Sequence, residues 1–187
     1  MAVEVTRRRF TADEYHQMAL AGILSERDRV ELVDGEIVAK MTFGQRHCAA
    51  VDRAARAMFL TVGDHAIVRV QGAARLDLFN EPEPDIILLR PRQDFYASGH
   101  PSGANILLIL EIADTSFEYD RDVKGPIYAR LGVLEYWIAD INEQRVLRYA
   151  LPGNGVYRRV DAHRRGRTLS PQLLPDCAVA VDDLLAD

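Results

Sequence analysis

Hydrophobic residues recur at helical spacing between Gly44 and about Val62. They are Cys48, Val51, Ala55, Met58, Phe59 and Val62. An apolar residue at every third or fourth position is typical of an amphipathic helix, and Gly63 is a suitable residue to end it. Nearer the N-terminus, Thr11 and Glu14 have the spacing of a capping box. This spacing predicts a short helix that reaches about Leu20.

A third helix is expected in the second half of the chain, after the polar stretch 114–116. Asp120 is a suitable N-cap for a helix that reaches Leu131, and Gly132 is a suitable stop. Pro126 lies inside this helix, where it lacks a backbone N–H and clashes with the preceding turn. We therefore expect the helix to be kinked or split.

The remaining apolar residues form short runs of the kind that predict β-strands. Asp34-Gly35 separates two of them and predicts a hairpin over residues 30–39. In the run 133–139, Leu134, Tyr136 and Ile138 face one side and Trp137 the other. The other expected strands cover residues 66–70, 85–89, 106–111, 145–150 and 156–160.

The order of these elements is helix, hairpin, helix, several strands, helix and further strands. It predicts an α/β fold of the mixed α+β kind, with a central β-sheet flanked by helices. At 187 residues, the chain is expected to form a single domain over residues 1–187. The segment 91–105 is expected to be a loop long enough to serve a function.

Two acids stand at the ends of the most apolar runs. Asp85 opens the run 85–89 and Glu111 closes the run 106–111. If these strands pair antiparallel, the start of the first lies beside the end of the second, so the carboxylates converge. Converging carboxylates repel each other unless a divalent cation lies between them. The pattern therefore predicts a metal site.

Composition and charge narrow the class of protein. The chain is 48% hydrophobic and 27% charged, as in ordinary globular proteins. The apolar runs are far shorter than the roughly 20 residues of a membrane helix, and the N-terminus lacks the apolar segment of an export signal. Cys48 and Cys177 have no metal-type spacing and are expected to be reduced thiols. We expect a cytoplasmic protein that does not interact with membranes.

The charge pattern is ambiguous about a nucleic-acid partner. A net charge of −5 argues mildly against one, but arginines cluster at 7–9, 158–159 and 164–167. These clusters are either a binding surface or ordinary solvated surface. Of the 23 basic residues only Lys40 and Lys124 are lysines. Since lysine is a compact charge with a tunable pKa, Lys124 becomes a candidate site residue.

Several segments together resemble the Uma family, a group of proposed endonucleases with the restriction-endonuclease-like fold, formerly a domain of unknown function. They are Val30-Glu31-Leu32-Val33-Asp34-Gly35-Glu36, Glu83-Pro84-Asp85-Ile86-Ile87, Leu110-Glu111-Ile112 and the residues Lys124, Tyr128-Ala129, Gly132-Val133 and Glu135-Tyr136-Trp137. The resemblance covers roughly residues 8–185. It implies a restriction-endonuclease-like core in which a central mixed sheet is flanked by helices.

The signature of that fold is Pro-Asp, followed after a gap by an acid, any residue and a lysine. Pro84-Asp85 and Glu111 match it, but Ala113 stands where the lysine is expected. The resemblance implies that Lys124, from the following helix, supplies the lysine instead.

The resemblance implies a metal-dependent endonuclease that hydrolyses DNA phosphodiester bonds with Mg²⁺ or Mn²⁺. Such ions prefer oxygen ligands, here Asp85, Glu111 and the carbonyl of Ile112. Lys124 is expected to stabilise charge on the phosphate or to help deprotonate the attacking water. Glu31 is a further candidate ligand or base, and His47 a candidate substrate contact. Folds of this kind often work as homodimers.

Structural roles are the alternative for each candidate. Asp85 could cap a turn, Glu111 could pair with an arginine, Glu31 and Lys124 could be solvated, and His47 could cap its helix. Tyr128, Tyr136 and Trp137 are expected to pack in the core. His16, His65, His100 and His163 form no recognisable constellation, which argues against a zinc site.

Two other functions remain open. The chain could be a catalytically inactive DNA-binding or protein-interaction module that keeps the nuclease fold, as Ala113 and the acidic net charge suggest. It could also be a metal-dependent hydrolase of another phosphoester.

Overall fold

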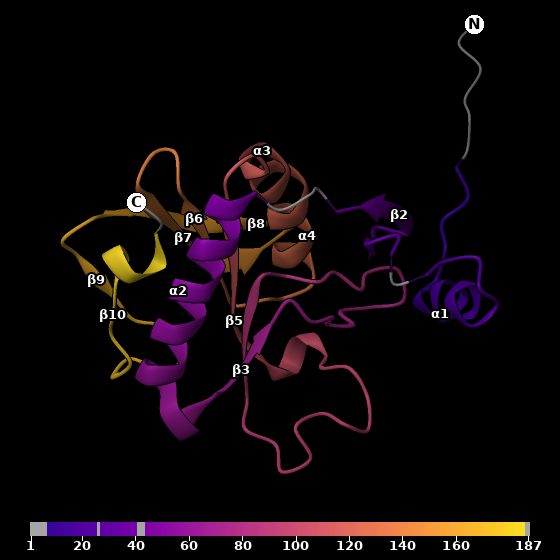
Figure 1. Ribbon diagram of the computed structural model, residues 1–187, viewed down its shortest axis with the longest axis horizontal. Helices are drawn as coiled ribbons and strands as arrows, with labels where there is room; N and C mark the ends of the chain where they lie inside the picture. Colours follow the sequence, from indigo (N-terminus) through magenta and orange to yellow (C-terminus); the bar gives the residue numbers. More distant parts are fainter. Residues whose placement is uncertain (1–6, 26, 41–43, 186–187) are drawn as a thin grey trace, which may run out of the picture.

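The computed structural model describes residues 7–25, 27–40 and 44–185 (Figure 1). Its α-helices are α1 (Ala12–Leu20), α2 (Gln45–Val62), α3 (Phe117–Tyr119) and α4 (Gly125–Arg130). A π-helical segment, η3 (Asp120–Lys124), joins α3 to α4, and 3₁₀ turns cover Gly63–His65, Gly103–Asn105 and Val181–Leu184. In these ranges, no helix combines the length and the apolar character that crossing a bilayer requires.

Six strands form the central sheet in the order β3-β4-β5-β6-β7-β8. They are β3 (Ile67–Val70), β4 (Ile86–Leu89), β5 (Ile106–Ala113), β6 (Glu135–Asp140), β7 (Arg145–Gly153) and β8 (Val156–Arg164). Only β5 and β6 pair in parallel, and their crossover carries α3, η3 and α4. The predicted mixed α/β fold with a central sheet is therefore confirmed.

Two small hairpins complete the fold. The pair β1 (Val30–Val33) and β2 (Glu36–Ala39) is the one predicted from Asp34-Gly35, and both turn residues have positive φ. A single antiparallel bridge between Leu32 and Glu81 connects β1 to the segment before β4. The pair β9 (Thr168–Leu169) and β10 (Val179–Ala180) lies beside α2, near the C-terminus (Figure 1).

Alternate residues of the central strands face opposite layers, as a strand's period of two requires. Leu108 and Leu110 of β5 join the core beneath α2, whereas Ile109 joins the core beneath α4. Trp137 and Tyr136 divide in the same way, which confirms the predicted sides of β6. Because the strands at the centre of the sheet are covered on both faces, they are mostly apolar, and Glu111 is the one charged residue of β5.

The pairing of β4 with β5 fixes the position of the two acids. The strands are antiparallel, as predicted, with Ile86 opposite Leu110. Asp85 directly precedes the first of these residues and Glu111 directly follows the second. The register therefore brings both acids to the same end of the strand pair.

The predicted apolar face of α2 is partly wrong. The buried residues of the helix are His47, Ala50, Val51, Ala54, Met58 and Val62, whereas Cys48 is exposed and Phe59 is 54% exposed. Ala50 and Ala54 have small side chains, so they let the helix approach the sheet closely. The predicted face included Ala55, which is only partly buried, and omitted Ala50 and Ala54, which are fully buried.

The predicted start of the third helix is also wrong. Helical structure begins with Ser116 as the N-cap of α3, and Asp120 is the first residue of η3 rather than an N-cap. Pro126 lies in the first turn of α4, where its missing N–H costs no hydrogen bond. The helix was expected to be kinked or split, and the structure has a π-helical segment that interrupts the α-helical pattern before Pro126.

Other boundaries differ modestly from the prediction. The strand β6 starts at Glu135 instead of residue 133. The strands β7 and β8 start as expected but end later, at Gly153 and Arg164. Cys48 and Cys177 are both free thiols, as expected.

Candidate active site

A cavity of about 260 Å³ lies where the start of β4 and the end of β5 bring the two acids together. Side chains from β1, α2, β5 and the α3–η3 region meet there. The charged and polar residues that line it are Glu31, Lys40, His47, Glu83, Asp85, Glu111, Thr115, Ser116, Tyr119, Asp120 and Lys124. Acids outnumber basic residues in this lining, so the cavity carries an excess of negative charge.

Asp85 is buried and held by two neighbours. Its Oδ2 accepts a hydrogen bond from the Ile112 backbone N–H at 2.9 Å, and its Oδ1 lies 3.2 Å from His47 Nε2. Burial raises the pKa of Asp85, but the hydrogen bond and charge of His47 outweigh burial and hold this pKa below its ordinary value. Asp85 is therefore an anion in the folded protein, and not only a cap for the turn after Pro84.

Glu111 lies directly beside Asp85. One carboxylate oxygen, Oε2, accepts the Asp85 backbone N–H at 3.1 Å. The other, Oε1, accepts Lys124 Nζ at 2.9 Å and the Tyr128 hydroxyl at 3.1 Å. Burial raises the pKa of Glu111 above its ordinary value, since the attraction of Lys124 is opposed by the charges of Asp85 and Glu31. The structural alternative for Glu111 was a pairing with an arginine, and the structure has a lysine there instead.

Lys124 joins two of the acids. Its Nζ lies 2.9 Å from Glu111 Oε1 and 3.2 Å from Glu31 Oε1, and the residue is only 6% exposed. Burial alone would lower the pKa of Lys124, but the charges of its acidic neighbours, Glu111 first, hold this pKa well above its ordinary value. The alternative that Lys124 is a solvated helix residue is therefore wrong.

Glu31 is likewise buried rather than solvated, at 2% exposed. Its Oε1 faces Lys124, and its Oε2 accepts the backbone N–H of Glu83 at 3.0 Å. The second contact attaches the β1–β2 hairpin to the segment that leads into β4. The solvent-facing acids of this hairpin are Asp34 in the turn and Glu36, which are both exposed.

His47 and Ile112 both act on Asp85. His47 is buried and contacts Asp85 directly, so it is not a surface cap of its helix. Burial lowers the pKa of His47, but hydrogen bonds to Asp85 and to the Ile112 backbone, together with the charge of Asp85, raise it overall. The structure thus shows a positioning contact for His47, and its contact with substrate stays a prediction. The role of the Ile112 carbonyl as a metal ligand likewise stays a prediction.

Sequence analysis missed two neighbours of Lys124. Tyr128 was assigned to the core, and it is buried, but its hydroxyl also donates to Glu111. Asp120 is 3% exposed, and its carboxylate accepts the Ser116 hydroxyl at 2.6 Å. Burial, and then the charge of Glu111, raise the pKa of Asp120 well above its ordinary value. Asp120, Lys124 and Tyr128 follow one another at intervals of four residues. This spacing could have indicated that they lie close together, since residues four apart share one helix face.

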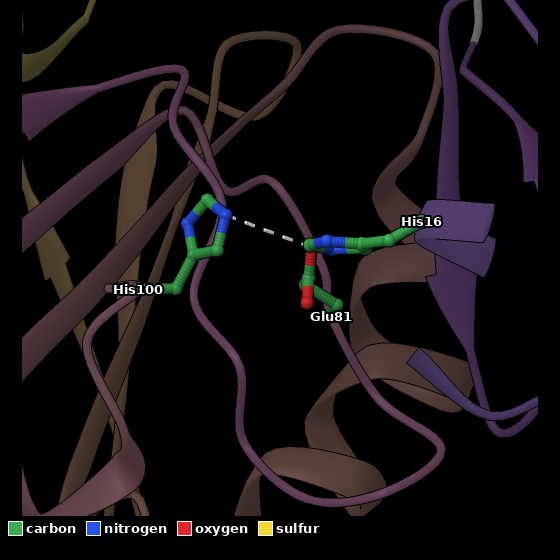
Figure 2. Close-up of side chains that lie close together, drawn as sticks. All are labelled: His16, Glu81 and His100. Atoms are coloured by element: carbon green, nitrogen blue, oxygen red, sulfur yellow. Dashed lines mark hydrogen bonds and ion pairs between the residues drawn. The ribbon is translucent and has the colours of Figure 1, made fainter. Parts of the chain in front are cut away.

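The interpretation that the histidines form no constellation is also wrong. His16 and His100 lie on either side of Glu81, outside the lining of the cavity (Figure 2). These residues are far apart in the sequence, so no spacing indicated their contact.

The predicted basic clusters are partly neutralised. Arg7, Arg8 and Arg9 form ion pairs with Glu36, Glu14 and Asp34 respectively, and Arg159 and Arg165 pair with Asp161 and Asp182. These clusters are therefore weaker candidates for binding phosphates than the sequence suggested.

The donor set at the cavity fits a hard divalent ion. Asp85 and Glu111 offer carboxylate oxygens at a site with excess negative charge, which is the environment that a dication stabilises. In the described ranges, no third carboxylate or histidine joins them with all ligand atoms within 4.8 Å of one another. Two carboxylates are nevertheless enough for Mg²⁺, which usually keeps several waters.

Comparison with known proteins places the chain in a family. The model of the Uma2 family, described as "Putative restriction endonuclease", matches residues 12–182. The chain belongs to the Uma2 family. None of the curated proteins searched matches it.

A solved structure shares the fold of this Uma2 chain. It is described as a putative nuclease belonging to DUF820 from Anabaena variabilis, and it superposes with a TM-score of 0.71 at 17% identity. The match covers 94% of this chain and 97% of the other. At this identity, the likeness establishes a common fold over nearly the whole of both chains.

The Uma2 chain departs from the fold's sequence signature at Ala113. This residue is fully buried at the end of β5, packed in the core beneath α4, where a charged side chain would be desolvated. Lys124 reaches Glu111 from the crossover instead, so a lysine and the acid are adjacent although the signature is broken.

The raised pKa of Asp120 predicts a pH-dependent change in stability. The folded protein binds this proton more tightly than the unfolded chain, so the contribution to stability is full below about pH 4 and is lost as pH rises toward the raised pKa. Asp120→Asn removes this dependence. In chelator-treated protein, the unfolding free energy of the variant minus that of wild type should increase above about pH 4, by at most roughly 1.4 kcal/mol per pH unit.

Urea unfolding between pH 4 and 7 measures this difference. Asp52→Asn, which changes an exposed carboxylate of α2, serves as the matched control and should give a much flatter curve. A difference for Asp120→Asn that does not vary with pH would contradict the assignment.

Proposed function

We propose that this Uma2 protein is a metal-dependent endonuclease that hydrolyses DNA phosphodiester bonds at the cavity between β1, α2, β5 and η3. The observation that carries the proposal is the convergence of Asp85 and Glu111, with Lys124 2.9 Å from Glu111. Membership of a family described as restriction endonucleases supports the same reaction class. The proposed site residues are Asp85, Glu111, Lys124 and Glu31, with the Ile112 carbonyl and His47 in supporting roles.

Asp85 and Glu111 are the proposed ligands of Mg²⁺ or Mn²⁺. A bound dication supplies a water of lowered pKa and offsets charge on the reacting phosphate. The Asp85 carboxylate is already ionised and oriented by the Ile112 N–H, so it needs no rearrangement to act as a ligand. His47 contacts the other oxygen of the same carboxylate, which makes it a positioning residue in this proposal.

Lys124 is proposed to stabilise negative charge on the phosphate. A lysine whose pKa is held well above its ordinary value keeps its proton at neutral pH, and therefore cannot accept one from water. The role of stabilising charge is thus favoured over the role of base. Glu31 and Tyr128 contribute by fixing the positions of the Lys124 ammonium and the Glu111 carboxylate. Glu31 is then the remaining candidate for the base that deprotonates the attacking water. Asp120 lines the same cavity.

DNA is the proposed substrate because of the family description, and the homodimer expected of this fold remains a proposal. The hairpin of β7 and β8 is the proposed interface, because β8 is an edge strand and exposes Val156 and Val160. Edge strands with apolar side chains are suited to pairing with another chain.

The alternative function is a catalytically inactive module that keeps the fold for DNA or protein binding. Lys124 bridges Glu31 and Glu111, so the buried charges are partly compensated without any metal. A module of this kind has no need to bind a dication at Asp85. Metal binding therefore distinguishes the two functions.

Asp85→Asn should abolish both metal binding and cleavage. The amide keeps the size of the side chain and can still accept the Ile112 N–H, but it removes one anionic ligand. Losing metal-assisted stabilisation of several kcal/mol should lower the cleavage rate by at least roughly 100-fold. The measurements are calorimetric titration with Mn²⁺ and cleavage of duplex and single-stranded DNA in Mn²⁺.

Asp64→Asn is the matched control, because Asp64 is an exposed aspartate at the end of α2. It should leave both activities unchanged. Wild type and Asp85→Asn cleaving DNA equally would remove the enzyme assignment, and an absence of Mn²⁺ binding to wild type would favour the inactive module.

Lys124→Met should separate metal binding from catalysis. Removing a cation beside Glu111 should leave Mn²⁺ affinity intact or tighter, while cleavage falls because charge on the phosphate is no longer offset. Breaking the buried ion pair should also destabilise the protein by about 3–5 kcal/mol without metal, and Mn²⁺ should restore part of this loss. Calorimetry, cleavage rates and urea unfolding with and without Mn²⁺ measure the three effects.

Lys40→Met provides the comparison, since Lys40 lines the same cavity but bonds to Glu83. Its effect on cleavage should be much smaller. Full activity in Lys124→Met would show that the lysine has a purely structural role.

A further inference from the structure

His16, Glu81 and His100 form a second cluster of potential ligands. His16 lies on α1, Glu81 precedes β4, and His100 lies in the 91–105 loop. Glu81 Oε1 is 2.6 Å from His16 Nε2 and 4.0 Å from His100 Nε2. One ligand atom from each residue lies within 4.8 Å of the other two. Figure 2 shows both imidazole rings beside the Glu81 carboxylate, with a ring nitrogen of His100 directed toward it.

The Glu81 carboxylate is unusually poor in partners for a buried acid. Its side chain is 4% exposed, and its ion-pair partners in the described part of the chain are the two histidines. Its second oxygen, Oε2, is buried and has no hydrogen-bond partner there. A buried carboxylate oxygen without a donor is costly. A cation bound to this carboxylate would offset that cost.

The backbone of Glu81 is fixed independently of its side chain. Its N–H donates to the Leu32 carbonyl at 2.9 Å, and this bridge joins the segment to β1. The carboxylate is therefore presented from a rigid position. The histidines are about 41% and 42% exposed, so water can reach the space between them.

We propose that His16, Glu81 and His100 bind a transition-metal dication, with Zn²⁺ as the best fit. Two imidazole nitrogens and one carboxylate suit Zn²⁺ and similar ions, whereas Mg²⁺ prefers oxygen ligands throughout. Three protein ligands leave a position for water, which agrees with the exposure of the histidines. The site differs in its donor set and its location from the cavity at Asp85 and Glu111.

The ion would cross-link three segments that are distant in the sequence. It would join α1 and the 91–105 loop to the residues before β4, which are bridged to β1 next to Glu31. Binding should therefore stabilise the part of the fold that presents Glu31 to the cavity. The inference does not depend on nuclease activity.

The test uses the full chain carrying Asp85→Asn, so that the proposed nuclease site does not take up the probe. Calorimetric titration with Zn²⁺, and the visible absorption of Co²⁺ as a coordination probe, measure binding. We expect one ion per chain, and an affinity at least roughly tenfold lower in His16→Ala and in His100→Ala. The double variant, which combines His16→Ala and His100→Ala, and the variant Glu81→Gln should both lose Zn²⁺ binding at this cluster. His65→Ala, at an exposed histidine, is the control and should bind as the parent does.

Thermal unfolding gives a second measurement. At a Zn²⁺ concentration about 100-fold above the dissociation constant, the melting temperature should rise by roughly 5–10 °C, and this rise should vanish in the double variant. Unchanged Zn²⁺ affinity in the double variant, or Zn²⁺ binding that disappears with Asp85→Asn alone, would overturn the proposal. Neither outcome would affect the nuclease assignment.

Discussion

The close approach of two buried carboxylates, Asp85 and Glu111, is the constraint on which the site depends. The antiparallel register of β4 and β5 brings them together, and burial makes their mutual repulsion costly. Hydrogen bonds from neighbouring residues offset this repulsion. His47 and the Ile112 N–H contact the Asp85 carboxylate, while Lys124 and Tyr128 contact the Glu111 carboxylate. These contacts hold both carboxylates at the cavity that we propose as the metal site.

The crossover between β5 and β6 supplies the lysine that lies beside Glu111. Ala113 packs in the core at the position where the signature of the fold has a lysine, and Lys124 lies next to the acid instead. The π-helical segment Asp120–Lys124 ends with Lys124 beside Glu111, and the α-helix α4 follows directly from Gly125, with Pro126 in its first turn. Wide π-helical turns are frequent at functional sites, where they redirect a side chain at a local cost in stability.

The sequence could predict the elements that depend on local patterns. Apolar runs and the Asp34-Gly35 turn indicated the strands, and antiparallel pairing of two runs was enough to bring Asp85 beside Glu111. The orientation of α2 could not be predicted, because close packing of Ala50 and Ala54 decides it. The partnership of Lys124 with Glu31 depends on where the β1–β2 hairpin docks. His16, Glu81 and His100 lie on three segments that are far apart in the sequence. No local sequence pattern indicates that these segments come together.

Anomalous diffraction from crystals soaked in Mn²⁺ tests the central claim most directly. We predict one manganese peak within bonding distance of carboxylate oxygens of both Asp85 and Glu111, with Lys124 still adjacent to the site. If the crystals held Mn²⁺ only elsewhere, or if the two carboxylates kept their contacts with His47 and Lys124 and no ion between them at saturating Mn²⁺, the account would be contradicted.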